Sequence, residues 1–228
     1  MTEPVKSKRA PFDLDLKTKP AGGWAGWRGP LAATGLAAIL RLPYLGQPQA
    51  IIFDETYYVK DSLALLTFGH ERKVIDDADS VLLSSGGENF ASIFTDAASY
   101  IVHPPVGKWV IASGEAIFGA TPFGWRIAIA ILGILSVLLT ARIARRLTNS
   151  NFIGTVAGLL LALDGLHIAM SRTALLDTSL SFFVLCAFGF LIMDRDSVNS
   201  GGSKSWRWAM VAALGLACAT KWSGIYFA

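Results

Sequence analysis

Long apolar runs separated by short polar segments dominate this sequence. Five runs stand out: 27–45, 122–141, 152–170, 174–193 and 206–228. The three central runs hold 19 or 20 residues with few charges, close to the ~20 that an α-helix needs to cross a bilayer. None alternates like a membrane strand, so the pattern predicts an all-α membrane protein with five spans. Arg41 and Pro43 interrupt the first run, and Lys221 interrupts the last.

The distribution of charge predicts which side of the membrane each polar segment occupies. Arg142, Arg145 and Arg146 follow the second span without an acid between them, and a polar tail with a basic excess, residues 1–30, precedes the first. The segment 46–121 instead carries 10 acidic and 4 basic residues. Because basic residues concentrate in cytoplasmic loops, the N-terminal tail is expected in the cytoplasm and 46–121 outside.

Composition excludes several classes of protein. Hydrophobic residues make up 53% of the 228 positions and charged residues only 16%, with a mean hydropathy of +0.47. Soluble domains carry about 25% charged residues, so a soluble enzyme, a disordered tail and a nucleic-acid-binding module are excluded. Cys186 and Cys218 lie inside apolar runs, and no disulfide framework is implied. Since the apolar run continues to Ala228, we expect the chain to be part of a longer protein.

The 76-residue segment 46–121 is much longer than a connection between two spans requires, which favours a functional role. Helical patterns cover 57–67 and 106–118, the second an amphipathic helix expected to lie along the membrane surface. The stretch 76–99 is rich in Asp, Ser, Gly and Asn and is expected to be ordinary loop. Asp54 and Glu55 occur in an apolar setting that commonly prepares a general base. The alternative is a solvated acidic pair that caps the next helix.

A second motif in this segment is HPPVGKW at 103–109. The two prolines fix the backbone and suit the first turn of a helix, and Gly107 permits close approach of another chain segment. His103 and Lys108 are then placed to donate to an anion near the helix N-terminus. The alternative is a rigid elbow that starts an interfacial helix, with Lys108 reaching to lipid headgroups.

Ionisable residues also interrupt the later spans, where they are functional candidates by default. They are Asp164, His167, Arg172, Asp177 and Lys221. Arg172 could bind an external phosphate, because its planar guanidinium suits that anion. The alternative for the group is an ion-pair network between helices, and His167 alone is better explained as a structural residue. Arg126, near the start of the second span, is expected to reach to the outer interface.

Carboxylates and cations that meet at one membrane face suit the transfer of a sugar from a lipid-linked phosphate to a hydroxyl. The departing phosphate is already a stable anion, so no general acid is required. One carboxylate to accept the proton of the acceptor and cations for the phosphate suffice. A hard cation could bind Asp54 and Glu55, but the pattern of oxygens does not predict a metal site.

The sequence resembles the protein O-mannosyltransferases, a family of the GT-C class of glycosyltransferases. The resemblance rests on FDETYY at 53–58, HPPVGKW at 103–109, SRTALLD at 171–177 and KWSG at 221–224. It implies a GT-C transmembrane domain, of which 31–228 is the N-terminal part, that moves mannose from a polyprenyl phosphate to Ser or Thr with inversion. No cofactor is implied, since the lipid-linked sugar is a substrate.

The resemblance also implies roles for individual residues. Asp54 would supply the catalytic carboxylate, with Glu55 as its partner or as an acceptor ligand. Our own candidates for contacts to donor or acceptor are His103, Lys108, Arg172, Asp177 and Lys221, with Arg172 and Lys221 assigned to the phosphate. Eukaryotic relatives often carry an Asp where this chain has Ile101, which favours an actinobacterial-type member in the plasma membrane. Two alternatives stay open: an aminoarabinose transferase that acts on lipid A, and a non-catalytic membrane scaffold.

Overall fold

The computed structural model describes residues 23–228, so most of the expected cytoplasmic tail lies outside the described residues. The elements are α1 (Ala25–Arg41), α2 (Glu55–Phe68), β1 (Arg72–Val74), α3 (Ala78–Ser84), the 3-10 helix η1 (Phe90–Ile93), β2 (Phe94–Ala98), α4 (Val106–Phe118), α5 (Pro122–Thr148), α6 (Asn151–Leu163), α7 (Gly165–Ser171), α8 (Leu176–Asn199), α9 (Trp206–Cys218) and the 3-10 helix η2 (Trp222–Phe227). Helices thus make up most of the described chain, as an all-α membrane protein requires.

Two helices, α5 and α8, are long and apolar enough to cross a bilayer by length and composition. The helices α6 and α7 pass the same test together, but they are bent by 63° at a short break. The break falls at Asp164, whose side chain caps α7 by accepting a hydrogen bond from the His167 backbone N–H at 2.6 Å. The single helix expected over 152–170 is therefore bent at Asp164.

The first and last expected spans contain shorter helices. α1 has 17 residues and α9 has 13, which correspond to about 26 Å and about 20 Å of helix against a hydrocarbon core of about 30 Å. η2 extends the last apolar run beyond α9 in a second short helix. That residues 27–45 and 206–228 cross the membrane stays a prediction.

Local sequence signals fix the ends of the central helices. Thr121 caps α5 by accepting a hydrogen bond from the Gly124 backbone N–H, and Pro122 occupies the first turn, where no amide donor is needed. α5 ends at Thr148 and is followed by Asn149, whose φ of 52° lies in the left-handed region that Asn tolerates. Ser150 then caps α6 in the same way as Thr121 caps α5. The tight turn places α5 and α6 antiparallel.

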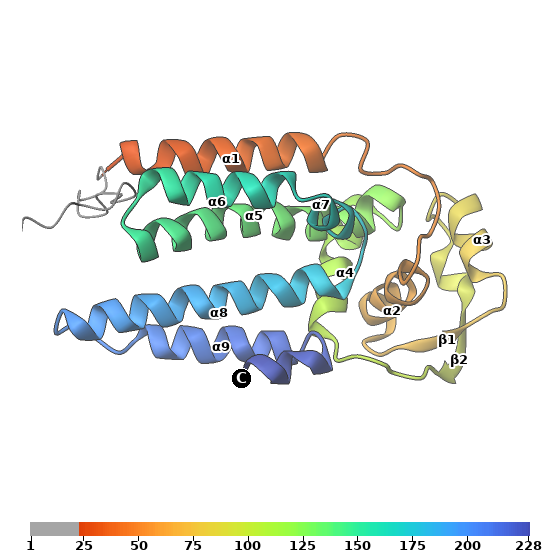
Figure 1. The fold of residues 1–228 in the computed structure, drawn as a ribbon. Coiled ribbons are helices and arrows are strands. Elements are labelled where there is room, and N and C mark those ends of the chain that lie inside the picture. The colour runs from red at the N-terminus through yellow and green to blue at the C-terminus, as the bar shows by residue number, and fades with distance from the viewer. Residues whose placement is uncertain (1–22) are drawn as a thin grey trace, which may run out of the picture.

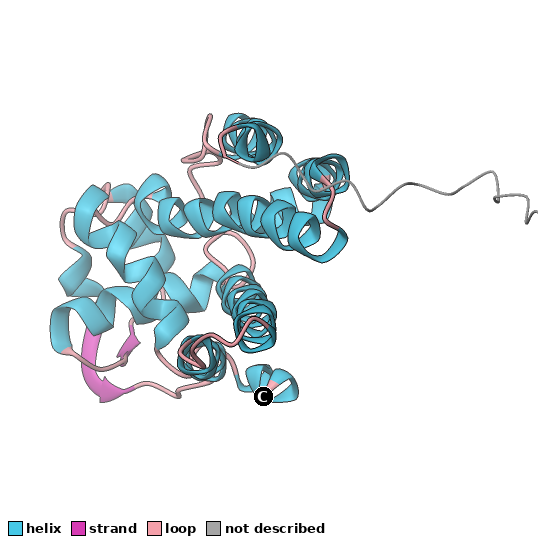
Figure 2. Ribbon diagram, turned by 90° about the vertical axis from the view of Figure 1, so that its left-hand side faces the viewer, coloured by secondary structure: helices cyan, strands magenta, loops and turns pink. Residues whose placement is uncertain are grey.

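Small residues allow the long helices to pack closely. Ala33 and Ala37 of α1 are fully buried against Val137 of α5 and Ala162 of α6. A Cβ at Gly158 would lie 2.9 Å from the Cβ of Ala141, so a larger residue there would push α6 away from α5. In Figure 1, α1, α6 and α5 form one group and α8 and α9 a second, and Figure 2 shows helices of both groups end-on.

The segment 46–121 folds over one end of these helices, on the right of Figure 1. Its helices α2 and α4 coincide with the two helical patterns in the sequence, and α4 has the predicted bounds. Trp125 of α5 and Leu176 of α8 pack with apolar side chains of this segment in one buried cluster. The stretch 76–99, expected to be ordinary loop, instead forms α3, η1 and β2. β2 pairs with β1 in a two-stranded antiparallel sheet, in which Arg72 lies opposite Ala98. A cross-strand ion pair between Arg72 and Asp96 supports that sheet.

Candidate active site

A cavity of about 290 Å³ opens where the segment 46–121 covers the helix ends. Its lining residues are Asp54, Tyr57, Tyr58, Asp61, Ser99, Tyr100, Val102 and His103. The two motifs singled out in this segment, at 53–58 and 103–109, therefore contribute to one cavity. They meet because α2 and α4 pack against each other and bring their N-terminal ends together.

Asp54 occupies the N-cap position of α2, and its side chain does not cap the helix. Within the described chain, its carboxylate makes no hydrogen bond or ion pair, and it lines the cavity. The preceding Phe53 has a φ of 53°, an uncommon left-handed conformation for a bulky residue. Conformations of this kind cluster at functional sites. The turn at Phe53 holds a carboxylate that remains available to a ligand.

Glu55 points away from this cavity and is fully buried. Its two carboxylate oxygens accept hydrogen bonds from Nε and Nη2 of Arg126, each at 2.8 Å. They also accept the backbone N–H groups of Ile52 and Ala174, each at 2.9 Å. All of these contacts fix the turn that precedes α2. Glu55 therefore has no free oxygen for the predicted role of partner or acceptor ligand, and we assign it a positioning role.

For Arg126, the sequence interpretation is wrong. It does not reach to the interface, because its side chain is fully buried in the ion pair with Glu55. The remaining guanidinium hydrogens are donated to backbone carbonyls between α1 and α2, those of Leu45, Pro48 and Ala50. A charged side chain in an apolar run needs a partner, and this requirement could have indicated that Arg126 is paired. The partner, 71 residues earlier in the chain, gives no local pattern.

His103 faces the same cavity, and its ring lies 6.2 Å from that of Tyr58. Its Nδ1 atom is buried without a hydrogen-bond partner among the described residues. Burial, followed by the charges of Lys221 and Lys108, lowers the pKa of His103, so the imidazole is neutral near pH 7. A neutral ring with an unused nitrogen is suited to exchange a hydrogen bond with a bound molecule.

Lys108 is buried and cannot contact a ligand directly. Its ammonium group lies 2.9 Å from Asp61 and 3.1 Å from Glu71, and only 1% of its side chain is exposed. Neither alternative from the sequence, an anion donor or a headgroup contact, fits this position. Burial raises the pKa of Asp61, while Lys108 opposes the shift. Asp61 lines the cavity too. It lies seven residues after Asp54, on the same helical face, and this spacing could have identified it as a residue of the same cavity.

Gly107 fulfils the role expected from the sequence. A Cβ atom at this position would lie 2.7 Å from Leu176 and 2.8 Å from Thr220. The Val106 backbone N–H also donates to the Ala219 carbonyl at 2.9 Å. Close approach at Gly107 thus brings the end of the chain, with Lys221, beside the cavity.

Lys221 and Asp177 form an ion pair of 2.8 Å, with 23% and 40% of their side chains exposed. Both influence groups of the cavity: Lys221 lowers the pKa of His103, whereas Asp177 helps to raise the pKa of Tyr58. Burial is the main cause of the Tyr58 shift, to about 12, and leaves the phenol protonated as a hydrogen-bond donor. Asp177 and Lys221 therefore belong to the surroundings of the Asp54 cavity.

Arg172 does not line the cavity. Its guanidinium donates to four backbone carbonyls at the end of α1, at 2.7 to 3.3 Å: Leu40, Arg41, Pro43 and Tyr44. Cations stabilise such exposed carbonyls at helix C-termini. His167 accepts a hydrogen bond from Arg41, with Nη2 and Nδ1 2.8 Å apart, and this contact agrees with a structural role. The ionisable residues that interrupt the later spans therefore do not form one cluster. Arg172 and His167 contact the end of α1, whereas Asp177 and Lys221 pair with each other.

Within the described residues, no group of three or more His, Cys, Asp and Glu side chains is placed to hold a metal ion.

The fold and this site define an all-α membrane protein that presents a carboxylate in a cavity at one end of its helices. The chain belongs to the dolichyl-phosphate-mannose-protein mannosyltransferase family, whose model matches residues 31–228. The earlier resemblance to the protein O-mannosyltransferases is thus confirmed.

Three similar relatives are named polyprenol-phosphate-mannose–protein mannosyltransferases. The Mycobacterium tuberculosis protein is 49% identical over 146 residues, covering 56% of this chain and 28% of its own length. The Mycolicibacterium smegmatis protein is 38% identical over 224 residues, covering 89% and 39%. The Corynebacterium glutamicum protein is 32% identical over 195 residues, covering 77% and 35%. The chain thus spans about a third of the length of these curated relatives.

A second group of relatives has a different name. An undecaprenyl phosphate-alpha-4-amino-4-deoxy-L-arabinose arabinosyl transferase of Pseudomonas paraeruginosa is 38% identical over 119 residues. The match covers 52% of this chain and 21% of that protein. Both groups are named for a sugar carried on a polyprenol phosphate, and they differ in the sugar.

Glu115 of α4 was not singled out in the sequence. It is 4% exposed, and neither carboxylate oxygen has a hydrogen-bond partner in the described part of the chain. The nearby Ser62 hydroxyl donates instead to the Val59 carbonyl at 2.8 Å. Burial raises the pKa of Glu115 from its ordinary 4.5 to about 8, so the carboxyl is protonated at neutral pH.

We expect this shift to make stability depend on pH. A raised pKa in the folded state contributes stability that is complete below pH 4.5 and is lost as the pH rises towards 8. The loss is ~1.4 kcal/mol per pH unit at most. Unfolding midpoints measured at pH 5 and pH 8 should therefore differ in the parent protein, and the difference should shrink in Glu115→Gln. Glu88→Gln, at an exposed position, is the control, and an equal pH response in all three would contradict the assignment.

Proposed function

We propose that the protein containing this chain transfers mannose from a polyprenyl-phosphate-mannose to Ser or Thr hydroxyls of secreted or membrane proteins. Family membership and the names of the actinobacterial relatives support the reaction class. One observation carries the assignment of the site: Asp54 presents to the cavity that both family-like motifs line a carboxylate without a partner among residues 23–228. Donor, acceptor protein and bilayer are the partners in this proposal.

In the proposed reaction, the acceptor oxygen attacks the anomeric carbon of mannose while its proton passes to Asp54. The bond between that carbon and the phosphate oxygen breaks, and the electron pair leaves with the polyprenyl phosphate. Attack opposite the departing phosphate inverts the anomeric carbon. General base catalysis by one positioned carboxylate contributes typically 10²- to 10⁴-fold. No cofactor is required, because the leaving group is an anion that needs no protonation.

The remaining residues divide into those near the donor and those that position the site. Lys221 keeps 23% of its side chain exposed and is the proposed phosphate contact, oriented by Asp177. His103 and Tyr58 supply hydrogen bonds from the cavity wall. Glu55, Lys108 and Arg172 hold the backbone and helices in place through the contacts described above. Electrostatic contacts of this kind act strongly where water is excluded.

The proposed orientation places the cavity on the extracytoplasmic face of the plasma membrane and the N-terminus in the cytoplasm. It is supported by the arginines at the far end of α5 and by the acidic excess of 46–121. Secreted acceptor proteins and the lipid-linked donor would meet at that face.

Membranes from cells that express the complete gene product test this function. Labelled mannose from polyprenyl-phosphate-mannose should appear on a Ser- or Thr-containing peptide. Transfer of label to lipid but not to the peptide would contradict the proposal. Transfer of labelled aminoarabinose, supplied on undecaprenyl phosphate, to lipid A would instead favour the aminoarabinose-transferase alternative, which the Pseudomonas match supports. A complete gene product that binds the donor but transfers nothing would favour the scaffold alternative.

A further inference from the structure

A second cavity, of about 250 Å³, lies between α5 and α8 and takes no part in the proposed reaction. Its lining residues are Leu139, Arg142, Ile143, Arg145, Arg146, Cys186, Gly189, Phe190, Ile192 and Met193. Along α5, Arg142 comes 16 residues after Arg126, which corresponds to about 24 Å of helix, and Arg146 is a further turn away. This separation is close to the thickness of a hydrocarbon core. The cavity therefore lies at the membrane surface opposite the Asp54 cavity.

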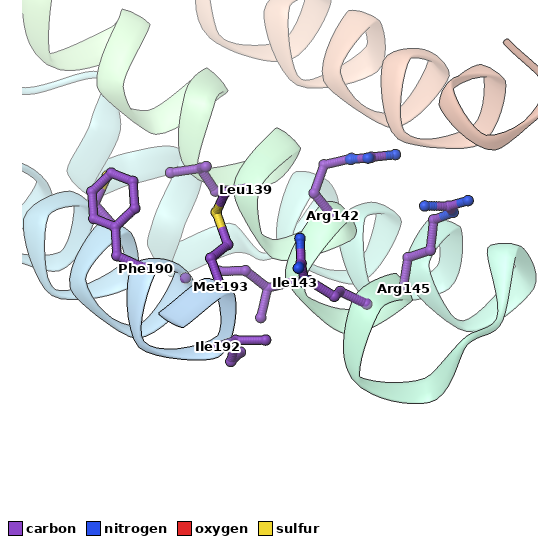
Figure 3. A pocket seen from close by; sticks show the side chains of 10 residues that line it. Leu139, Arg142, Ile143, Arg145, Phe190, Ile192 and Met193 are labelled. Atoms are coloured by element: carbon purple, nitrogen blue, oxygen red, sulfur yellow. The ribbon is translucent and has the colours of Figure 1, made fainter. Parts of the chain in front are cut away.

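The lining has an apolar end and a cationic end. Figure 3 shows Leu139, Phe190 and Met193 together on one side, with Arg142 and Arg145 on the other. Among the described residues that line the cavity, none is acidic. A molecule that fills both ends needs an apolar chain attached to an anionic group.

The arginines are held in place by contacts that leave further donors on two of them. Arg142 lies 3.8 Å above the Trp27 ring and donates one hydrogen bond to the Gly26 carbonyl. Arg146 donates its Nε hydrogen to Asp196, which also accepts from Arg195. Arg145 donates to the Asn151 side chain. Since a guanidinium carries five N–H donors, Arg142 and Arg146 keep donors for an additional anion.

We propose that this cavity binds an anionic phospholipid of the leaflet opposite the Asp54 cavity. The headgroup phosphate contacts Arg142 and Arg146, and the upper part of one acyl chain lies against Phe190 and Met193. Charge complementarity supports this occupant: Arg142 and Arg146 keep donors in a lining that has no acidic residue among the described ones, which favours an anion, and each basic residue near an anionic leaflet contributes to lipid binding. A free phosphate would leave the apolar end unfilled, and a neutral lipid would leave the remaining donors of Arg142 and Arg146 without an acceptor.

Photolabelling of the complete gene product tests this proposal. The protein is placed in phosphatidylcholine vesicles that contain a few per cent of phosphatidylglycerol with a photoreactive group in the acyl chain. Peptides that carry Phe190 and Met193 should be labelled, and photoreactive phosphatidylcholine should label them far less. Arg146→Gln should lower the labelling about fivefold. Lys204→Gln, at an exposed position at the same end that does not line the cavity, is the matched control.

A second variant leaves the charges unchanged. A Cβ at Gly189 would lie 3.3 Å from Ile143, so Gly189→Leu should fill the apolar end and lower labelling while a normal unfolding midpoint is retained. Four outcomes would overturn the proposal. These are equal labelling by the two lipids, equal losses in the Arg146 and Lys204 variants, competition by inorganic phosphate at constant ionic strength, and absence of label because another part of the protein covers this face.

Discussion

Asp54→Asn should reduce the rate of mannosyl transfer by about 100-fold or more while the protein still inserts and folds. The substitution keeps the shape of the side chain but removes the oxygen that accepts the proton of the acceptor hydroxyl. Because the Asp54 side chain has no partner within the described chain, its replacement breaks no structural contact. Turnover should be measured with the complete gene product in membranes, together with the unfolding midpoint.

Asp96→Asn provides a matched control for Asp54→Asn. Asp96 belongs to the same segment, and its side chain is fully exposed in a surface ion pair with Arg72. Exposed pairs of this kind contribute little, so both activity and stability should remain unchanged. Full activity of Asp54→Asn would refute the assignment of the base. A strong loss of folded protein would show instead that Asp54 has a structural role.

The sequence predicted the parts of the site that depend on local order. Asp54 lies at the start of a helix, and His103 precedes a helix that begins where Pro104 and Pro105 indicate. Both residues line one cavity, because each stands beside the N-terminus of a helix of the same packed pair. Periodicity and helix-start signals identify such positions, since the information is contained in a few neighbouring residues.

Contacts between distant residues were not predictable in this way. Lys108 pairs with Glu71, 37 residues earlier, and Asp177 pairs with Lys221, 44 residues later. Sequence spacing did not identify the partners of Arg172 and Asp177 either. The break at Asp164 was missed for a related reason. Asp164 and Gly165 inside an apolar run are compatible with a straight helix. Only the hydrogen bond by which the Asp164 side chain caps α7 shows that a new helix begins there.

The second large effect is expected at the buried pair of Glu55 and Arg126. Arg126→Met should destabilise the folded protein by about 3–5 kcal/mol, because it leaves the Glu55 carboxylate buried without its cation. It also removes the donors to the Leu45, Pro48 and Ala50 carbonyls, which hold the chain between α1 and α2. The unfolding midpoint in detergent should fall sharply, and little folded protein should accumulate in membranes.

A double-mutant cycle distinguishes a structural pair from a catalytic one. Glu55→Gln combined with Arg126→Met removes both charges, so the double variant should be clearly more stable than the sum of the single effects predicts. In the double variant, activity per folded molecule should fall less than in Asp54→Asn, since Asp54 keeps its carboxylate and loses only the support of the turn at Phe53. If Arg126→Met instead left the unfolding midpoint unchanged and abolished transfer, the pair would act in the reaction, and Glu55 would belong with Asp54 in the catalytic site.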